Sequence, residues 1–283
     1  MEVLKLASRS APSVAPERLY VLHRPMSGPV IALVVYAPPL AEEMNKSRRM
    51  AAQQARMFAA NGVATLLVDP LGCGDSDGDL ADATWHAWVD DLVDACQWLR
   101  ERTGAPGAPL WLWGLRSGCL ISVGAGSRIA GDCRHLLWQP VQSGRQCLQQ
   151  FLRLKTAGGL ADGRAAASTA ELLRQLADGA ALDVAGYRLS SVLADGLGAA
   201  TLEPPARPTQ ALMLEVQPQP GSSPSPGLLA LESRWSGAGH VVAVTAVAGP
   251  SFWQTSEVED APELVALTTR LVVAASRETA AAR

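Results

Sequence analysis

The sequence predicts an α/β fold in which a mostly parallel central sheet carries helices on both faces and a small helical cap. Apolar runs rich in β-branched residues alternate along the chain with helical segments, as in folds built around a parallel sheet. The pattern changes to helical pieces only over residues 141–208. We therefore expect residues 1–140 and 209–283 to form the core and residues 141–208 to form a cap insertion, over the edge where open α/β sheets bind ligands.

The first half of the core contains two buried strands with a helix between them. Pro29–Tyr36 (PVIALVVY) and Val63–Val68 (VATLLV) are continuous apolar runs, which is typical of strands covered on both faces. The intervening helix is expected to begin at Ser47 and to end at Asn61-Gly62, where glycine allows a left-handed stop. A stretch around Arg18–Arg24 is a candidate strand at the sheet edge.

The segment Thr84–Arg102 is an amphipathic helix whose apolar residues recur at helical spacing. Asp90, Asp91 and Asp94 fall on the other side of this helix. We interpret them as a solvated face rather than as a metal site.

The rest of the sheet follows from four more apolar runs, and helices surround them. The predicted strands are Pro109–Trp113, Arg134–Pro140, Thr209–Val216 and His240–Ala248; the predicted helices are a small-residue segment after Gly118, then Gln146–Leu154 and Thr169–Leu176 in the cap, and Glu263–Ser276 at the end. Residues 217–227 (QPQPGSSPSPG) are expected to form a mobile loop. The last residues, 278–283, are expected to fray.

Composition excludes several classes of function. The 283 residues carry 27 acidic and 24 basic side chains, a net charge of −3, so no nucleic-acid partner is expected. No apolar run is long enough for a signal peptide or a membrane span, which predicts a cytoplasmic protein without membrane insertion. The five cysteines are expected to be reduced thiols. The four histidines are scattered, so neither a metal nor a cofactor is expected.

The most informative motif is a strand that runs into Gly-Leu-Arg-Ser-Gly and then into a helix. In a nucleophile elbow, glycines two residues before and two after the central residue allow a sharp turn that exposes the central side chain. Gly114 and Gly118 place Arg116 at that position. A register centred on Ser117 would put Leu115 and Cys119 where the turn needs glycine.

Four segments resemble a known family of α/β hydrolases, the exosortase A system-associated hydrolase 2 family. They are Tyr36–Arg49 (YAPPLAEEMNKSRR), Val68–Gly78 (VDPLGCGDSDG), Leu110–Gly118 (LWLWGLRSG) and Gly249–Leu264 (GPSFWQTSEVEDAPEL). The resemblance implies an α/β-hydrolase fold and a cytoplasmic protein of bacteria that make exopolysaccharide and sort proteins with a PEP-CTERM tail. It also implies an acyl ester or thioester hydrolase or transferase, although that label depends on kinship of fold.

The three roles of a serine hydrolase lack their usual residues at the expected positions. A guanidinium stays protonated and cannot attack a carbonyl, so Arg116 is not a nucleophile. No Asp or Glu occurs from Val216 through Leu231, and Glu215 is expected inside a strand. No histidine follows His240, which is expected at the opposite end of the sheet.

Three other residues are alternative nucleophiles. Ser117 follows the elbow residue, and its hydroxyl is expected to cap the next helix. Cys119 begins that helix, and we interpret it as a small buried core residue. Cys73 lies in a loop at the carboxyl edge, where a side chain can face the cleft, but no histidine accompanies it, so a structural role is favoured for it too.

The segment from Leu40 to Asn45 occupies the loop that supplies oxyanion-hole contacts in this fold. An arginine in a partly dry pocket is costly unless it is paired. We therefore expect Glu42 or Glu43 to pair with Arg116. The expected ligand-binding residues are Leu40, Glu42, Glu43, Asn45, Arg116, Ser117 and Trp253.

Three functions remain open from the sequence. The chain is an acyl hydrolase or transferase with an unusual set of residues, a non-catalytic protein that binds an anionic small molecule at Arg116, or a scaffold subunit of an exopolysaccharide system. A homo-oligomer is compatible with each of them. The expected small-molecule partner is anionic or bears an acyl group.

Overall fold

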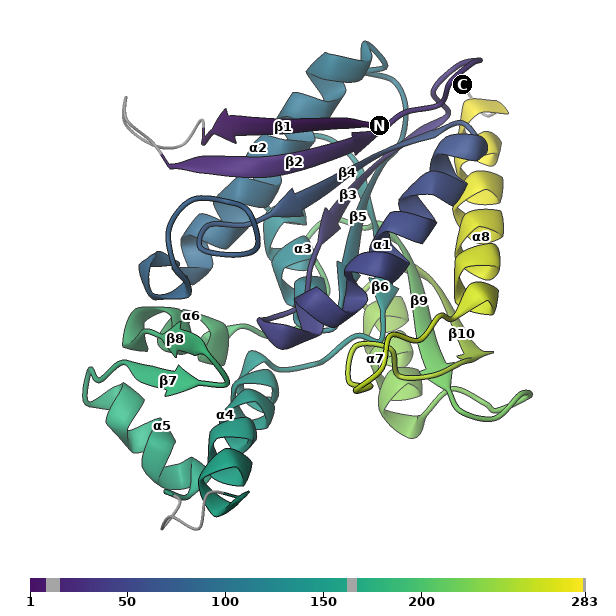
Figure 1. Ribbon diagram of the computed structural model, residues 1–283. Coiled ribbons are helices and arrows are strands. Elements are labelled where there is room, and N and C mark those ends of the chain that lie inside the picture. The colour runs from purple at the N-terminus through teal and green to yellow at the C-terminus, as the bar shows by residue number, and fades with distance from the viewer. Residues whose placement is uncertain (9–15, 162–166, 282–283) are drawn as a thin grey trace.

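The computed structural model describes residues 1–8, 16–161 and 167–281, and its centre is one mostly parallel sheet (Figure 1). The strands follow the order β1-β2-β4-β3-β5-β6-β9-β10. Strand β2 runs antiparallel to β1 and β4, and the remaining neighbours are parallel. Their bounds are β1 (Glu2–Ala7), β2 (Glu17–His23), β3 (Ala32–Ala37), β4 (Val63–Asp69), β5 (Leu110–Leu115), β6 (Cys133–Trp138), β9 (Gln210–Gln217) and β10 (Val241–Ala248).

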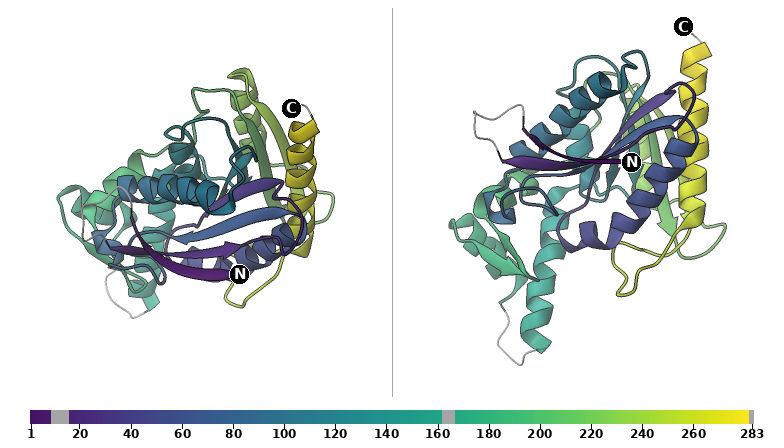
Figure 2. Two further views of the ribbon diagram at one scale, coloured as in Figure 1. Left: turned by 90° about the horizontal axis from the view of Figure 1, so that it is seen from above. Right: turned by 45° about the horizontal axis from the view of Figure 1, so that its top comes forward.

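Helices cover both faces of the sheet, as predicted. One face carries α1 (Glu42–Ala60) and α8 (Pro262–Ala281), and the other carries α2 (Trp85–Thr103), α3 (Gly118–Gly126) and α7 (Pro226–Gly237) (Figures 1 and 2). Strand β3 shows why both faces are apolar: Val34 packs with the α1 and α8 side chains, whereas Val35 packs with those of α2 and α3. Side chains alternate along a strand, so a strand between two helical layers must be apolar throughout.

The described part of the segment that joins β6 to β9, here called the insertion, lies beyond the carboxyl edge of the sheet (Figure 1). It contains α4 (Gly144–Ala161), α5 (Thr169–Ala177), β7 (Leu182–Val184), β8 (Tyr187–Leu189) and α6 (Ser191–Ala199). The two helices expected from the sequence are α4 and α5. The β7–β8 hairpin was not expected. Ala185 and Gly186 both have positive φ, 49° and 86°, which suits a two-residue hairpin turn.

Helix α6 attaches the insertion to the core. A Cβ atom added to Gly196 would lie 2.5 Å from Cβ of Trp85, so only glycine permits this approach of α6 to α2. Apolar side chains of the insertion, among them Leu152 and Leu197, are fully buried in the same cluster as the α2 and α3 side chains. The insertion and the sheet therefore share one core.

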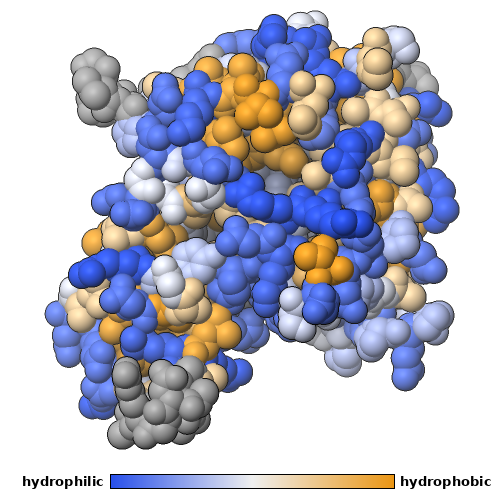
Figure 3. All heavy atoms as spheres, viewed as in Figure 1, coloured by the Kyte–Doolittle hydropathy of each residue, from blue (hydrophilic) through white to orange (hydrophobic). Residues whose placement is uncertain are grey.

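The N-terminal edge differs from the expectation. The strand expected around Arg18–Arg24 is β2, but it lies second in the sheet because β1 covers its outer side. The short alternating segment Glu2–Ala7 was not recognised as a strand. In the view of Figure 3, an apolar patch lies in the upper part of the molecule, over β1 and β2. Val3 of β1 is 58% exposed.

Helix α1 begins at Glu42, five residues before the expected start at Ser47. The hydroxyl of Ser47 donates to the carbonyl of Met44 inside the helix instead of capping its first turn. The chain enters the helix through Ala41, which has φ of 52°. Glu42 and Glu43 occupy the first turn, where the helix dipole favours negative charge. The segment expected to be a loop is thus partly helical.

The interpretation of the α2 aspartates as a solvated face is wrong for two of the three. Asp91 is 2% exposed and Asp94 is 6% exposed. Asp91 accepts from Nε of Arg18 at 2.8 Å and from the backbone N–H of Leu71 at 2.9 Å. Burial is tolerated because the charge is paired. Asp90 is partly exposed and pairs with Arg128.

The C-terminal third contains one helix that the sequence reading missed. The residues expected to form a mobile loop, 217–227, lead into α7, whose N-cap Ser225 accepts from the N–H of Leu228, with Pro226 directly after it. A serine followed by proline is a helix-start signal. Helix α8 extends to Ala281, beyond the expected end at Ser276, and residues 282–283 lie outside the described residues.

Candidate functional site

Arg116 stands at the turn between β5 and α3 with the backbone of an elbow residue. Its φ is +55°, and its N–H donates to the carbonyl of Trp138 at 3.0 Å. A Cβ atom on Gly114 would lie 2.5 Å from the backbone of Cys119, and one on Gly118 would lie 2.1 Å from the carbonyl oxygen of Ala37. Neither position admits a side chain. The structure therefore has the register that the sequence predicts, with Arg116 as the central residue.

The Arg116 guanidinium is held on two sides. Its Nε and Nη2 atoms each donate to Oε1 of Glu43 at 3.3 Å, and Nη2 also donates to Oε1 of Gln150 at 2.7 Å. The ring of Trp253 lies 5.8 Å from the guanidinium carbon, within the range of a cation–π contact. The expected ion pair is formed by Glu43, and Glu42 makes none with Arg116 among the described residues.

The two glutamates are in an environment that disfavours their charge. Burial raises the pKa of Glu43, although Arg116 acts in the opposite direction. Burial also raises the pKa of Glu42, and the neighbouring Glu43 carboxylate adds to the effect. For Glu43, the loss of solvation raises the carboxyl pKa by more than the nearby Arg116 guanidinium lowers it.

Ser117 does not cap α3, contrary to the expectation. Its Oγ atom accepts the backbone N–H of Leu40 at 2.8 Å, and it makes no capping bond to the helix. Leu40 lies in the loop between β3 and α1. In hydrolases with such an elbow, a backbone N–H of this loop points at the oxyanion. Here that N–H of Leu40 is engaged by a side chain.

These residues surround a cavity of about 430 Å³, here called the Arg116 cavity. That volume lies within the range of small-molecule sites. Its lining residues are Leu40, Glu42, Glu43, Lys46, Arg116, Ser117, Cys147, Gln150, Phe151, Arg153, Leu154, Trp253 and Gln254. Six of the seven expected site residues are among them. Asn45 is not, because its side chain leaves α1 on another side and donates to the Tyr187 hydroxyl at 2.8 Å.

The sequence reading missed the wall that α4 contributes. Cys147, Gln150, Phe151 and Leu154 line the cavity at spacings of three, four and seven residues, which places them on one face of a helix. That periodicity was available in the sequence. The surface that this face would meet was not, because it depends on how the insertion folds back.

The thiols near the cleft are held in their neutral form. Cys119 is fully buried, as expected, and burial raises its pKa. Burial also raises the pKa of Cys147 to about 12. Cys73 faces a different cavity, and burial, reinforced by the Asp69 carboxylate, raises its pKa to about 12. A thiol is a poor nucleophile until it ionises.

The remaining acid–base candidates lie away from Arg116. Glu215 is inside β9, as expected, and its Oε2 atom accepts the N–H of Ser225 at 2.7 Å. His240 directly precedes β10, at the amino end of the parallel strands, where its Nδ1 atom accepts the N–H of Thr209 at 3.1 Å. Arg116 follows the carboxyl end of β5, so the sheet separates His240 from it.

Within residues 1–8, 16–161 and 167–281, His, Cys, Asp and Glu side chains form no group of three that could hold a metal ion. None of the helices described is both long and apolar enough to cross a membrane.

Comparisons with known proteins establish the fold. No protein-family model matches the chain, and no curated protein matches it in sequence. Among solved structures, it is similar to the ferulic-acid-bound Est1E from Butyrivibrio proteoclasticus, with a TM-score of 0.68 and 14% identity over 98% of this chain and 99% of that one.

Two further structures agree with this likeness. An α/β serine hydrolase homologue from Coxiella burnetii gives a TM-score of 0.57 and 15% identity over 96% of this chain and 97% of that one. The α/β hydrolase domain-containing protein 10 from mouse gives 0.59 and 14%, over 98% of each chain. At such identities the likeness concerns the fold alone. The chain has the α/β-hydrolase fold.

Proposed function

From an α/β-hydrolase fold that carries a guanidinium at its elbow, we propose that this protein binds an anionic small molecule in the Arg116 cavity and does not cleave it. One observation carries the proposal. Nη1 of Arg116 has no hydrogen-bond partner among the described residues, while Nε and Nη2 are fixed by Glu43 and Gln150. Arg116 lines the cavity, so the two N–H groups of Nη1 are available to a ligand.

The composition of the cavity suits a carboxylate or a phosphate on an apolar body. Three cations, Lys46, Arg116 and Arg153, line it against the two carboxyls of Glu42 and Glu43. Phe151, Leu154 and Trp253 supply an apolar wall. A guanidinium that is already oriented loses little side-chain entropy when an anion binds, and its hydrogen bonds to an anion are charge-assisted.

The same geometry disfavours hydrolysis. Arg116 has no lone pair with which to attack a carbonyl. The Ser117 hydroxyl is engaged by the Leu40 N–H, and the nearby thiols are held neutral by burial. His240 lies at the other edge of the sheet, with Nδ1 already bonded.

Two other functions remain as alternatives. The esterase and hydrolase structures that share this fold favour an acyl ester or thioester hydrolase or transferase. The four family-like segments favour a setting in an exopolysaccharide system that sorts proteins with a PEP-CTERM tail, in which the chain could also be a scaffold subunit or a homo-oligomer.

Binding is tested by calorimetry with octanoate and octyl phosphate as anionic probes and octanol as the neutral comparison. We expect both anions to bind and octanol to bind far more weakly. Arg116→Ala should abolish anion binding, and Arg116→Lys should weaken it by about tenfold, because an ammonium cannot form the forked contact. Arg145→Ala, an exposed change on α4 outside the cavity, is the matched control. Equal affinity of Arg116→Ala and the unchanged protein for octanoate would overturn the proposal.

Hydrolysis is tested on the same preparations with nitrophenyl esters, acyl thioesters and a fluorophosphonate probe. We expect neither turnover nor labelling. Turnover that disappears in Ser117→Ala or Cys73→Ala would establish the hydrolase alternative instead.

A further inference from the structure

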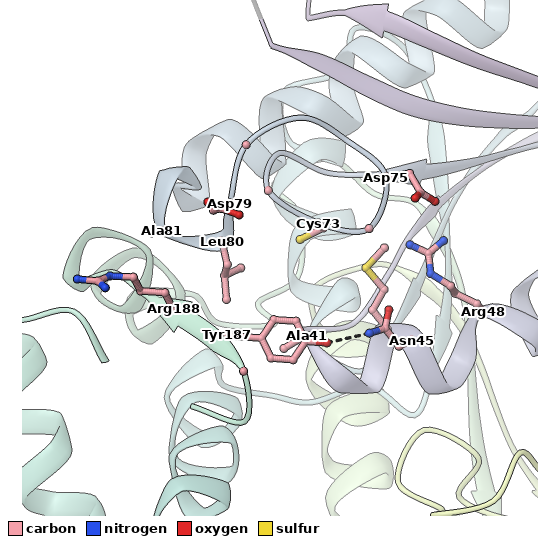
Figure 4. Close-up of a pocket in the computed structure, with 15 residues that line it drawn as sticks. Ala41, Asn45, Arg48, Cys73, Asp75, Asp79, Leu80, Ala81, Tyr187 and Arg188 are labelled. Carbon is pink, nitrogen blue, oxygen red and sulfur yellow. Dashed lines mark hydrogen bonds between the residues drawn. The ribbon is translucent and has the colours of Figure 1, made fainter. Parts of the chain in front are cut away.

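A second cavity, separate from the Arg116 cavity, lies between the insertion and the loop that follows β4. Its volume is about 620 Å³, larger than that of the Arg116 cavity. Three segments that are distant in sequence form it: α1, residues 72–81, and the tip of the β7–β8 hairpin. Figure 4 shows Arg48 and Arg188 at opposite sides of this space, with the Cys73 thiol and the Tyr187 ring between them. We call it the Tyr187 cavity.

The shape of this cavity depends on two glycines. A Cβ atom on Gly74 would lie 2.0 Å from Nη2 of Arg48, and one on Gly72 would lie 2.1 Å from the carbonyl oxygen of Asp79. Both glycines have positive φ, 58° and 69°. The loop is thereby folded tightly against Arg48, which donates to Asp69 at 2.8 Å. This loop, held by close contacts to Arg48 and Asp79, forms an ordered wall of the cavity.

The charges that line the Tyr187 cavity cancel. Arg48 and Arg188 oppose Asp75 and Asp79, whereas cations are in excess in the Arg116 cavity. Arg48 is also paired with Asp69, so the two guanidiniums offer no net positive charge to a ligand. An anionic ligand therefore gains little electrostatic free energy here. An uncharged ligand avoids the cost of stripping water from a charge of its own.

Hydrogen-bonding groups of both kinds face the cavity. The Tyr187 hydroxyl accepts from Nδ2 of Asn45 and keeps its own O–H to donate, and Oδ1 of Asn45 remains an acceptor. Asp75 and Asp79 supply acceptors at the cavity wall, whereas the Arg188 guanidinium points away from Tyr187 (Figure 4). The Tyr187 ring and Leu80 add a limited apolar surface. This mixture matches a molecule with many hydroxyl groups and a weakly apolar ring face.

We propose that the Tyr187 cavity is a binding site for an uncharged polyhydroxyl ligand of the size of a monosaccharide or disaccharide. The site uses the hairpin residue Tyr187 together with Asn45 and Asp79. It does not depend on the function proposed for Arg116, because the two cavities have no lining residue in common.

The test uses the full chain and saturation-transfer NMR with glucose, galactose and maltose as neutral probes, and with citrate and octanoate as comparisons. At least one sugar should bind in preference to both comparisons. Tyr187→Phe and Asp79→Ala should each weaken sugar binding by about fivefold, the effect of losing one hydrogen bond. Arg145→Gln, an exposed arginine on α4 outside this cavity, should leave it unchanged.

A second readout reports the location. Residues 72–81 line the Tyr187 cavity, whereas residues 217–225 lie outside it. Bound sugar should slow amide hydrogen exchange in residues 72–81, followed by mass spectrometry, and leave the exchange of residues 217–225 unaltered. The proposal is overturned if no sugar binds, if only citrate or octanoate binds, or if a bound sugar protects both segments equally.

Discussion

The backbone N–H of Leu40 donates to the side-chain oxygen of Ser117 at 2.8 Å, which links the loop after β3 to the elbow after β5. Both residues are buried. In the serine hydrolases of this fold, an N–H of this loop helps to bind the oxyanion. In this chain the Leu40 N–H instead joins two residues that line the Arg116 cavity and fixes their positions.

Removing that hydroxyl should destabilise the protein. Ser117→Ala leaves the Leu40 N–H buried without a partner, which costs about 1–3 kcal/mol. Urea unfolding followed by tryptophan fluorescence measures the change. Ser233→Ala, an exposed serine on α7, is the control and should alter the free energy of unfolding by less than about 0.5 kcal/mol. Equal effects of the two changes would show that the bond contributes nothing.

Glu43 should compete with an external anion for Arg116. Glu43→Gln removes the competing charge but keeps an oxygen that can accept from the guanidinium, so octanoate should bind several-fold more tightly. Glu42→Gln, in the same helical turn but without an ion pair to Arg116, should have a smaller effect. Calorimetry compares the two variants. Weaker binding by Glu43→Gln would contradict the competition.

The buried pair of Arg18 and Asp91 should be essential to stability. Asp91→Ala leaves the Arg18 guanidinium buried without its carboxylate, which typically costs about 3–5 kcal/mol. The adjacent Asp90→Ala breaks a partly exposed pair with Arg128 and should cost less than about 1 kcal/mol. The free energies of unfolding in urea separate the two cases. Similar losses for the neighbouring aspartates would refute the role of burial.

Acid should destabilise the fold through His135. This side chain is fully buried beside Trp235, and burial lowers its pKa from 6.5 to about 3. The unfolded chain therefore takes up a proton below pH 6.5 that the folded chain refuses. Stability is retained above pH 6.5 and is lost as the pH falls toward 3, by up to about 1.4 kcal/mol per pH unit.

His135→Leu should flatten this dependence, because leucine takes up no proton in either state. Melting temperatures between pH 7 and pH 4 measure the slope. His86→Gln changes an exposed histidine and should leave the slope as it is. An unaltered slope in His135→Leu would assign the acid sensitivity to other groups.

The elbow was predictable because its requirements are local. Gly114 and Gly118 are needed for steric reasons that a five-residue pattern already expresses, and the flanking apolar strand fixes the frame. The Glu43 partner was predictable for a similar reason: a buried guanidinium needs a carboxylate, and the two candidates were adjacent in sequence.

Other features depend on contacts across the fold. Asp91 appeared solvent-facing on a helical projection, but Arg18 from a strand 73 residues earlier meets it there. Asn45 was expected beside Arg116 because the start of α1 was placed too late. Once the helix begins at Glu42, helical geometry turns Asn45 toward Tyr187. Neither outcome follows from any local pattern.

The hydrogen bond between Leu40 and Ser117 also bears on redesign. Installing serine at position 116 would restore a hydroxyl at the crest of the elbow, yet the amide of Leu40 would remain occupied by its neighbour at position 117. A designed hydrolase would also need the Leu40 N–H released from the Ser117 hydroxyl and a histidine placed in the loop after β10. No single substitution is therefore expected to produce hydrolase activity.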